Sequence, residues 1–133
     1  MILNGSMLIG ASEAYGDEGT LQAINPASGQ AIDTPQFGQG GAAEVERAAG
    51  LAAEAFDNYR QQPLSQRAAL LEAIAENIEA LGDTLIERAH QETGLPLARL
   101  QGERGRTVGQ LRLFAKVVRD GHFLGATLDS AQP

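Results

Sequence analysis

The sequence predicts a mainly helical chain in which four helices follow an N-terminal β-hairpin arm. Two observations carry this prediction. Before residue 42, apolar residues come in short runs broken by glycine and proline, which is typical of strands and turns. After it, apolar residues recur at spacings of three and four, which is typical of amphipathic helices. We therefore expect an arm at 1–41, a helical region at 42–120 and a final segment at 121–133.

The arm contains one clear hairpin signal. Residues 25–29, with the sequence Asn-Pro-Ala-Ser-Gly, lie between two strand-like runs at 20–24 and 30–34. Proline presets one backbone angle of a turn, and Gly29 can adopt a positive φ. The segment therefore predicts a hairpin with its turn at 25–29.

Two amphipathic helices are expected next, each with an apolar stripe that should be buried. The first covers 42–60. Pro63 ends it and opens the second, which Gly82 stops. The stripes consist of Val45, Ala49, Ala52, Phe56 and Tyr59 in the first helix and Leu71, Ile74, Ala75, Ile78 and Leu81 in the second.

A short third helix should begin at Asp83 as its N-cap and end at Thr93-Gly94. Its buried residues would be Leu85, Ile86 and Ala89.

Pro96 is well placed to open a fourth helix that runs to about Asp120. Three glycines, at 102, 105 and 109, lie on one stripe of it, and each costs about 1 kcal/mol relative to alanine. We expect another backbone to approach closely along that stripe, which only glycine permits. Apolar residues between 108 and 118 cover more than one face, so the second half of the helix should be buried on most sides.

Composition excludes several classes of function. A net charge of −7 argues against nucleic-acid or anionic-membrane partners. The absence of cysteine removes disulfides, thiolate metal sites and a cysteine nucleophile, and two distant histidines make no metal site. No serine lies in a nucleophile motif. Residues 1–10 do not resemble a signal peptide, and no stretch is apolar enough to span a bilayer, so we assign the cytoplasm by default.

The fourth helix carries the candidate binding residues. Arg106 and Gln110 are four residues apart and are followed on the same face by Leu113, Phe114 and Val117. A guanidinium and an amide on an apolar surface suit a small molecule that bears a carboxylate. The alternative is an ordinary surface or ion-pair role. For Arg104 and Arg112 we expect pairing with acids such as Glu103, or stems that run along the core to solvent.

Several segments in order resemble the N-terminal part of the aldehyde dehydrogenase superfamily. They are the Asn-Pro-Ala-Ser-Gly turn, the proline-opened second helix, Glu-Thr-Gly-Leu-Pro at 92–96 and Leu-Arg-Leu-Phe-Ala at 111–115. The segment at 102–107 is similar to the branch that oxidises 2,5-dioxovalerate, also called α-ketoglutaric semialdehyde. Many members have lysine where this chain has Leu95.

The resemblance implies an α/β parent enzyme with a Rossmann-like cofactor domain, NAD or NADP as cofactor, an aldehyde substrate and a homo-oligomeric state. The family's cysteine nucleophile and its water-activating glutamate lie downstream, so this stretch would hold no catalytic, cofactor-binding or metal-binding residue. It would be inactive alone, and its partner would be the remainder of the enzyme or a second copy. Residues 121–133 would begin the crossing to oligomerisation strands, and the fourth helix would border the substrate tunnel.

Two hypotheses therefore stand. The first is an inactive N-terminal fragment of an aldehyde dehydrogenase. The second is a stand-alone helical interaction module that presents an exposed apolar face to a protein partner. The reading frame beyond Pro133 distinguishes them, since a cysteine motif there favours the enzyme and a stop codon favours the module.

Overall fold

The computed structural model describes residues 3–127 and 129–130. The chain forms two compact units. The first contains the residues up to Gln61 together with Asp83–Leu100, and the second contains Gln62–Gly82 together with the residues from Gln101 on.

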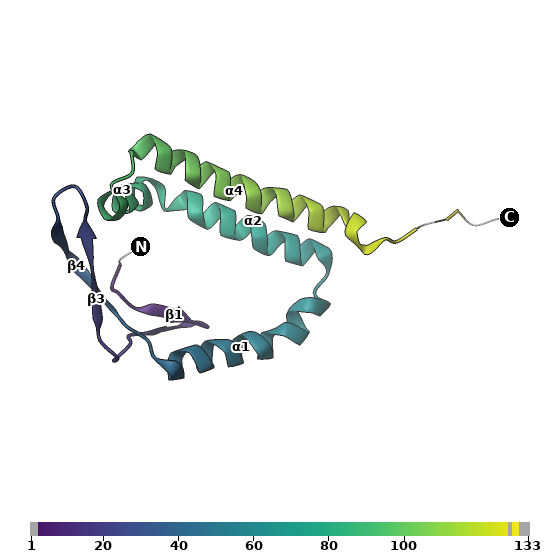
Figure 1. Cartoon of the computed structure of the whole chain (residues 1–133). Coiled ribbons are helices and arrows are strands. Elements are labelled where there is room, and N and C mark those ends of the chain that lie inside the picture. Colours follow the sequence, from purple (N-terminus) through teal and green to yellow (C-terminus); the bar gives the residue numbers. More distant parts are fainter. Residues whose placement is uncertain (1–2, 128, 131–133) are drawn as a thin grey trace. The chain divides into compact units, whose positions relative to one another are not determined.

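The predicted hairpin is confirmed in the first unit. Strands β3 (Thr20–Asn25) and β4 (Gln30–Gly38) pair antiparallel, with Asn25 opposite Gln30 at the turn (Figure 1). The turn is closed by two hydrogen bonds: the amide of Gly29 donates to the carbonyl of Asn25 at 2.8 Å, and the amide of Ala27 donates to Asn25 Oδ1 at 2.9 Å. Gly29 has φ +68°, as a turn with glycine at this position requires.

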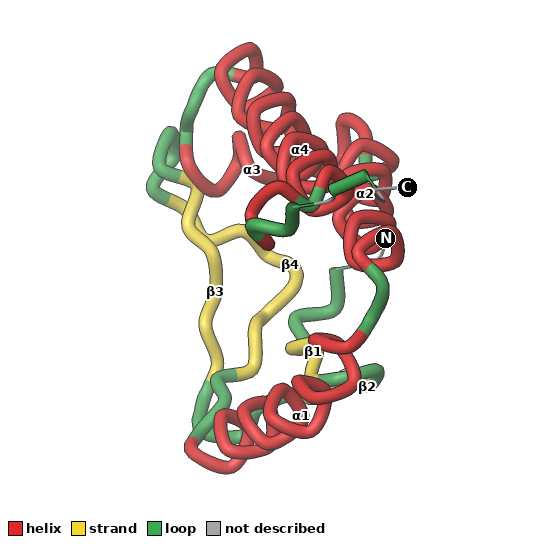
Figure 2. Tube along the Cα trace, turned by 90° about the vertical axis from the view of Figure 1, so that its right-hand side faces the viewer, coloured by secondary structure: helices red, strands yellow, loops and turns green. Residues whose placement is uncertain are grey.

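A second strand pair lies beside the first helix. Strands β1 (Met7–Ile9) and β2 (Ser12–Ala14) form an antiparallel ribbon (Figure 2). Helix α1 (Ala42–Gln61) rests on it, because Arg47 Nη2 donates to Ser12 Oγ at 2.7 Å and the Leu51 side chain lies against Gly10. Strands of three residues are too short to show periodicity, which is why the sequence did not predict this ribbon.

Helix α1 has the predicted bounds to within one residue, but its expected burial is wrong. Val45, Phe56 and Tyr59 are 67%, 60% and 44% exposed. The helix meets the β1–β2 ribbon through the face of Arg47 and Leu51, which lies on another side of the helix from the apolar stripe. The described residues of the first unit therefore leave the stripe uncovered.

In the second unit, α2 (Leu64–Ala80) and α4 (Leu97–Asp120) lie side by side and run antiparallel (Figure 1). Their buried residues are Ala68 and Ala75 on α2 and Val108 and Ala115 on α4. The two buried residues of each helix are seven residues apart, so each helix buries only one narrow line of side chains. We call the line of these four buried residues the seam. Within the predicted α2 stripe, Ala75 is buried and Ile74 is 39% exposed.

Two expectations for α4 are wrong. Its second half is not buried on most sides, since Leu113, Phe114 and Val117 are 53%, 49% and 43% exposed. No described atom outside the helix lies within 4 Å of a Cβ built on any of its three glycines, so no backbone approaches that stripe. The physical reason is that α2 covers α4 along a single seam within this unit.

The remaining elements are short. Helix α3 (Gly82–Thr93) begins one residue before the expected N-cap, so Asp83 lies in its first turn; Ile86 is buried, while Leu85 and Ala89 are half-buried. A 3₁₀ turn, η1 (His122–Leu124), follows α4 and was not predicted. The predicted crossover at 121–133 falls partly outside the described residues. Among the described residues, no helix is long and apolar enough to cross a membrane.

Candidate functional site

Arg106 and Gln110 lie on the side of α4 that faces away from its buried seam. Both are exposed, and they share this side with the exposed side chains of Leu113 and Val117. The guanidinium of Arg106 is held by Glu103, with Nε 3.1 Å from Oε2, and its side chain is 74% exposed. The structure thus brings a cation, an amide and an apolar strip together on one open helical surface.

Three other arginines of α4 tie this helix to the flank of α2 and to Gly82, which follows α2. Arg112 makes two hydrogen bonds to Glu79, at 3.0 and 2.6 Å, and Arg119 makes two to Glu72, both at 2.8 Å. Arg104 Nη1 donates to the carbonyl of Gly82 at 2.6 Å. The partners of Arg104 and Arg112 are therefore on or beside α2, and the suggested Glu103 pairs with Arg106 instead.

These ion pairs shift the pKa values of their members. Hydrogen bonds from Arg119 and Arg112 lower the pKa values of Glu72 and Glu79 respectively, and the same bonds raise the pKa values of the two arginines. At the end of α4, the hydrogen bond from Lys116 lowers the pKa of Asp120. The Glu72–Arg119 and Glu79–Arg112 pairs join α4 to α2, so the role of these four groups is structural.

In the first unit, the Asn-Pro-Ala-Ser-Gly turn and the Glu-Thr-Gly segment come together. Pro26, in the hairpin turn, lies against Gly94, which follows α3 with φ +70°. Arg88 on α3 reinforces the junction, because its Nη1 donates to the carbonyl of Thr34 at 2.6 Å and its Nε pairs with Glu92 at 2.5 Å. The turn and the Glu-Thr-Gly segment are thus one structural junction, which their separation in sequence did not reveal.

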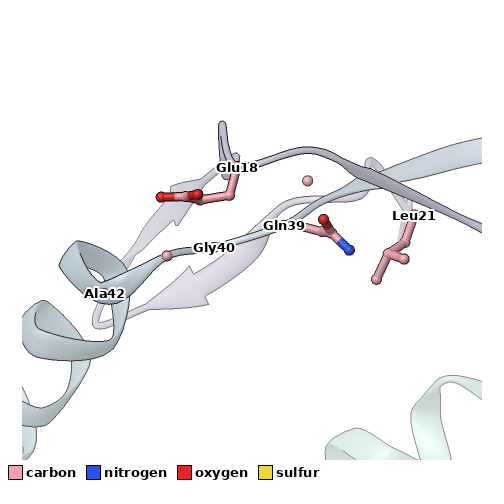
Figure 3. A pocket seen from close by; sticks show the side chains of 7 residues that line it. Glu18, Leu21, Gln39, Gly40 and Ala42 are labelled. Atoms are coloured by element: carbon pink, nitrogen blue, oxygen red, sulfur yellow. The ribbon is translucent and has the colours of Figure 1, made fainter.

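An open hollow of about 560 Å³ lies where β4 ends and α1 begins (Figure 3). The first amide of this helix start is already occupied: Gly41 N donates to Glu44 Oε2 at 2.8 Å, so the chain caps its own helix. With Glu18 beside it, the hollow presents negative charge and does not suit an anionic ligand. Its lining residues are Glu18, Leu21, Gly38, Gln39, Gly40, Gly41 and Ala42.

No segment among the described residues has the arrangement of the dinucleotide-binding fingerprint. A dinucleotide is held by a glycine-rich loop between a parallel strand and a helix. In the described residues the strands pair only antiparallel, and the three glycines of α4 lie inside a helix. Nor does any group of three or more His, Cys, Asp or Glu among the described residues form a metal site.

Comparison with known proteins identifies the family. The model of the aldehyde dehydrogenase family matches residues 14–132, and the chain belongs to this family. It is 67% identical over its whole length to alpha-ketoglutaric semialdehyde dehydrogenase 2 of Azospirillum brasilense, and 45% identical over 98% of its length to alpha-ketoglutaric semialdehyde dehydrogenase of Acinetobacter baylyi. It spans 25% and 24% of the length of these two relatives.

Solved structures agree with the family. The crystal structure of succinate-semialdehyde dehydrogenase from Burkholderia pseudomallei matches 86% of this chain, and 23% of its own, with a TM-score of 0.77 and 29% identity. An NAD-dependent benzaldehyde dehydrogenase from Corynebacterium glutamicum matches 88% of this chain, and 25% of its own, with a TM-score of 0.80. At 22% identity the second match shows the fold alone.

Proposed function

We propose that this chain is the N-terminal part of an NAD(P)-dependent dehydrogenase that oxidises α-ketoglutaric semialdehyde to the corresponding acid. The observation that carries the proposal is the 67% identity along the whole chain to the Azospirillum brasilense protein of that name. The 45% identity to the Acinetobacter baylyi protein of the same activity supports it.

The chemistry itself belongs to the rest of the enzyme in this proposal. The chain has no cysteine, so a thiol nucleophile must come from elsewhere, and the chain alone is inactive. The parent is an α/β enzyme with a Rossmann-like cofactor domain and assembles as a homo-oligomer. The proposed α/β architecture is supported by the likeness of this chain to semialdehyde dehydrogenases that are about four times as long.

Arg106 and Gln110 are the proposed contacts for the substrate. The substrate has an aldehyde at one end and a keto-acid carboxylate at the other, and a guanidinium binds a carboxylate through charge-assisted hydrogen bonds. Arg106 is 74% exposed, so its free nitrogens are accessible, while Glu103 holds only Nε. The exposed Leu113 and Val117 beside it would contact the apolar carbons of the substrate.

The test compares two proteins. One is the 133-residue chain, and the other is a full-length chimera in which this chain replaces the matching quarter of the Azospirillum brasilense relative. Intact mass establishes each species, and nicotinamide reduction with α-ketoglutaric semialdehyde measures activity. We expect turnover from the chimera alone. Turnover by the cysteine-free chain contradicts the assigned mechanism, and a chimera that folds but prefers other aldehydes contradicts the assigned substrate.

A second candidate is the stand-alone interaction module. The observation that favours it is the exposure of Phe56 on α1 and Phe114 on α4, since large apolar side chains left in water mark surfaces that bind other proteins. A chain that purifies from its source at 14.0 kDa, bound to a protein other than a dehydrogenase, would support this candidate.

A further inference from the structure

An Asn-Gly pair begins at Asn4, and in such a pair the asparagine side chain loses ammonia readily. The reaction starts when the backbone nitrogen of the next residue attacks the side-chain carbonyl carbon, and a glycine has no side chain to obstruct the approach. The chain contains four asparagines, and only Asn4 is followed by glycine. Asn25 precedes Pro26, which has no N–H, and Asn58 and Asn77 lie inside helices before larger residues.

The structure leaves Asn4 in water and holds its carboxamide by two hydrogen bonds. Asn4 is exposed, its Oδ1 accepts from the amide of Ser6 at 3.0 Å, and its Nδ2 donates to Glu13 Oε2 at 2.7 Å. Attack on the carbonyl carbon moves both of these carboxamide atoms, so the reaction has to break the bonds that they make. Each bond therefore slows the reaction in the folded chain.

The backbone of Gly5, whose nitrogen would attack, is held as well. Its carbonyl accepts from the amide of Gly38 at 3.1 Å, and Gly5 is buried with φ +78°. A Cβ built on Gly5 would lie 1.8 Å from the carbonyl oxygen of Gln36. The residue is thus packed against β4, and a product with an additional backbone carbon beside it does not fit there.

We propose that Asn4 is a deamidation site that the fold protects, and that deamidation detaches the segment at 3–6 from β4. The Gly5 nitrogen bonds to Asn4 Cγ and passes its proton through water to Nδ2, which leaves as ammonia. The resulting succinimide takes up one water and opens to aspartate or isoaspartate, so one amide and one water become one carboxyl group and one ammonia. This chemistry does not depend on the proposed function.

Either product disturbs the contacts of the segment. A new carboxylate at position 4 faces the Glu13 carboxylate, so repulsion replaces the hydrogen bond from Nδ2. Isoaspartate also lengthens the backbone next to Gly5, which has no free space beside Gln36. Deamidation would therefore prevent the segment from returning to its place.

The first experiment measures the rate of deamidation in mildly alkaline buffer for the full-length chimera described above, its variants and a synthetic peptide of residues 1–13. Peptide mapping by mass spectrometry detects the mass increase that replacement of the side-chain –NH2 by –OH gives. Glu13→Ala removes the acceptor of Nδ2, and Glu13→Gln keeps an oxygen acceptor. Glu46→Ala is the matched control, because it removes the same charge from an exposed position of α1. Thermal unfolding establishes that each variant is folded.

We expect Asn4 to deamidate about tenfold or more slowly in the chimera than in the peptide, since the reaction needs local opening. Glu13→Ala should raise the rate in the chimera by about threefold or more, and Glu13→Gln and Glu46→Ala should leave it near the wild-type rate. Equal rates in the chimera and the peptide overturn the protection, and a slower reaction in Glu13→Ala overturns the role of Glu13. If neither the chimera nor Glu13→Ala reacts at Asn4 while the peptide reacts to completion, Asn4 is not a deamidation site in this protein.

The second experiment tests the detachment with Asn4→Asp, which reproduces one product. Hydrogen exchange of the Gly38 amide, which donates to Gly5, reports whether the segment stays in place. We expect this exchange to become about threefold or more faster in Asn4→Asp, and to return towards the wild-type rate when Glu13→Gln is added, because glutamine can donate to the new carboxylate. Unchanged exchange at Gly38 in Asn4→Asp would overturn the detachment.

Discussion

Pro26 and Gly94 are in contact although 67 residues separate them in sequence: a Cβ built on Gly94 would lie 3.0 Å from Pro26 Cγ. Gly94 also has φ +70°, which side chains with a Cβ rarely adopt. The junction between the hairpin turn and the end of α3 therefore disfavours a larger residue at position 94 for two independent reasons.

Gly94→Ala should lower the free energy of unfolding of the chain by about 2 kcal/mol, because it adds backbone strain and crowds Pro26. Gly29→Ala is the matched control, with φ +68° and no described atom within 4 Å of the added Cβ, and it should cost only about 1 kcal/mol of strain. Urea denaturation measures both. Equal losses would mean that the contact with Pro26 contributes nothing.

Ala75→Leu should destabilise the chain by about 1–3 kcal/mol, because Ala75 is 0% exposed in the seam between α2 and α4 and has no room for three more carbons. Ala73→Leu makes the same chemical change at an exposed position of α2 and should be nearly neutral. The comparison is made by chemical denaturation of the two variants. A neutral Ala75→Leu would show that the helices are not packed as described.

Gly105→Ala should stabilise the chain by roughly 1 kcal/mol, since alanine favours the helix and the new methyl group meets no described atom within 4 Å. The unfolding midpoint of the isolated chain is the measurement. A loss of stability would reveal a neighbour that occupies the space beside Gly105.

The Glu72–Arg119 and Glu79–Arg112 pairs predict a pH dependence. Their hydrogen bonds lower both glutamate pKa values below the ordinary 4.5, so the stabilisation is fully present above pH 4.5 and is lost as the pH falls through the lowered values. A Glu72→Gln, Glu79→Gln double variant should therefore unfold at a lower temperature than the wild type at neutral pH, and the gap should narrow in acid. Because both pairs are exposed, about 1 M salt should narrow it as well. If the difference in unfolding temperature between the wild type and the double variant does not change with pH, the difference comes from packing and not from the ion pairs.

Arg106→Ala in the full-length chimera should raise KM for α-ketoglutaric semialdehyde by roughly tenfold or more, and leave KM for a neutral aldehyde unchanged, if the guanidinium binds the substrate carboxylate. Glu103→Gln is the companion variant: it frees Arg106 and should not weaken binding of the acid substrate. Steady-state kinetics with both aldehydes decide the matter. Equal changes for the two substrates would remove Arg106 from the substrate site.

Local signals in the sequence were sufficient for most elements. Proline and glycine mark both sides of each helix from Pro63 onward, and the turn at 25–29 has the residues its geometry needs, so these boundaries lie within about two residues of the observed ones. The β1–β2 ribbon was missed, since three-residue strands contain no repeat to detect.

Burial was predicted less well, and for one physical reason. An apolar stripe such as that of Val45 and Phe56 shows which face of a helix avoids water, but it does not show whether the covering element belongs to the same stretch of chain. Prediction of the candidate site from the sequence meets the same limit, because the spacing of residues shows which side chains share a face but not what lies opposite that face. The face shared by Arg106 and Gln110 follows from their spacing of four, whereas the pairing of Arg112 with Glu79 depends on how α4 lies along α2.

The two ion pairs between α2 and α4 repeat with the same spacing as the buried seam, and this has a consequence for alignment. Sliding α4 by one turn along α2 breaks both pairs and moves Ala115 off the seam. Sliding it by seven residues, about 10 Å, restores the seam and re-forms one pair, for example Glu79 with Arg119. The facing surfaces thus discriminate strongly against slips of one turn and less strongly against a slip of two turns. Two interactions favour the observed alignment over the slip of two turns: the second ion pair, and the bond from Arg104 to the Gly82 carbonyl, which has no repeat.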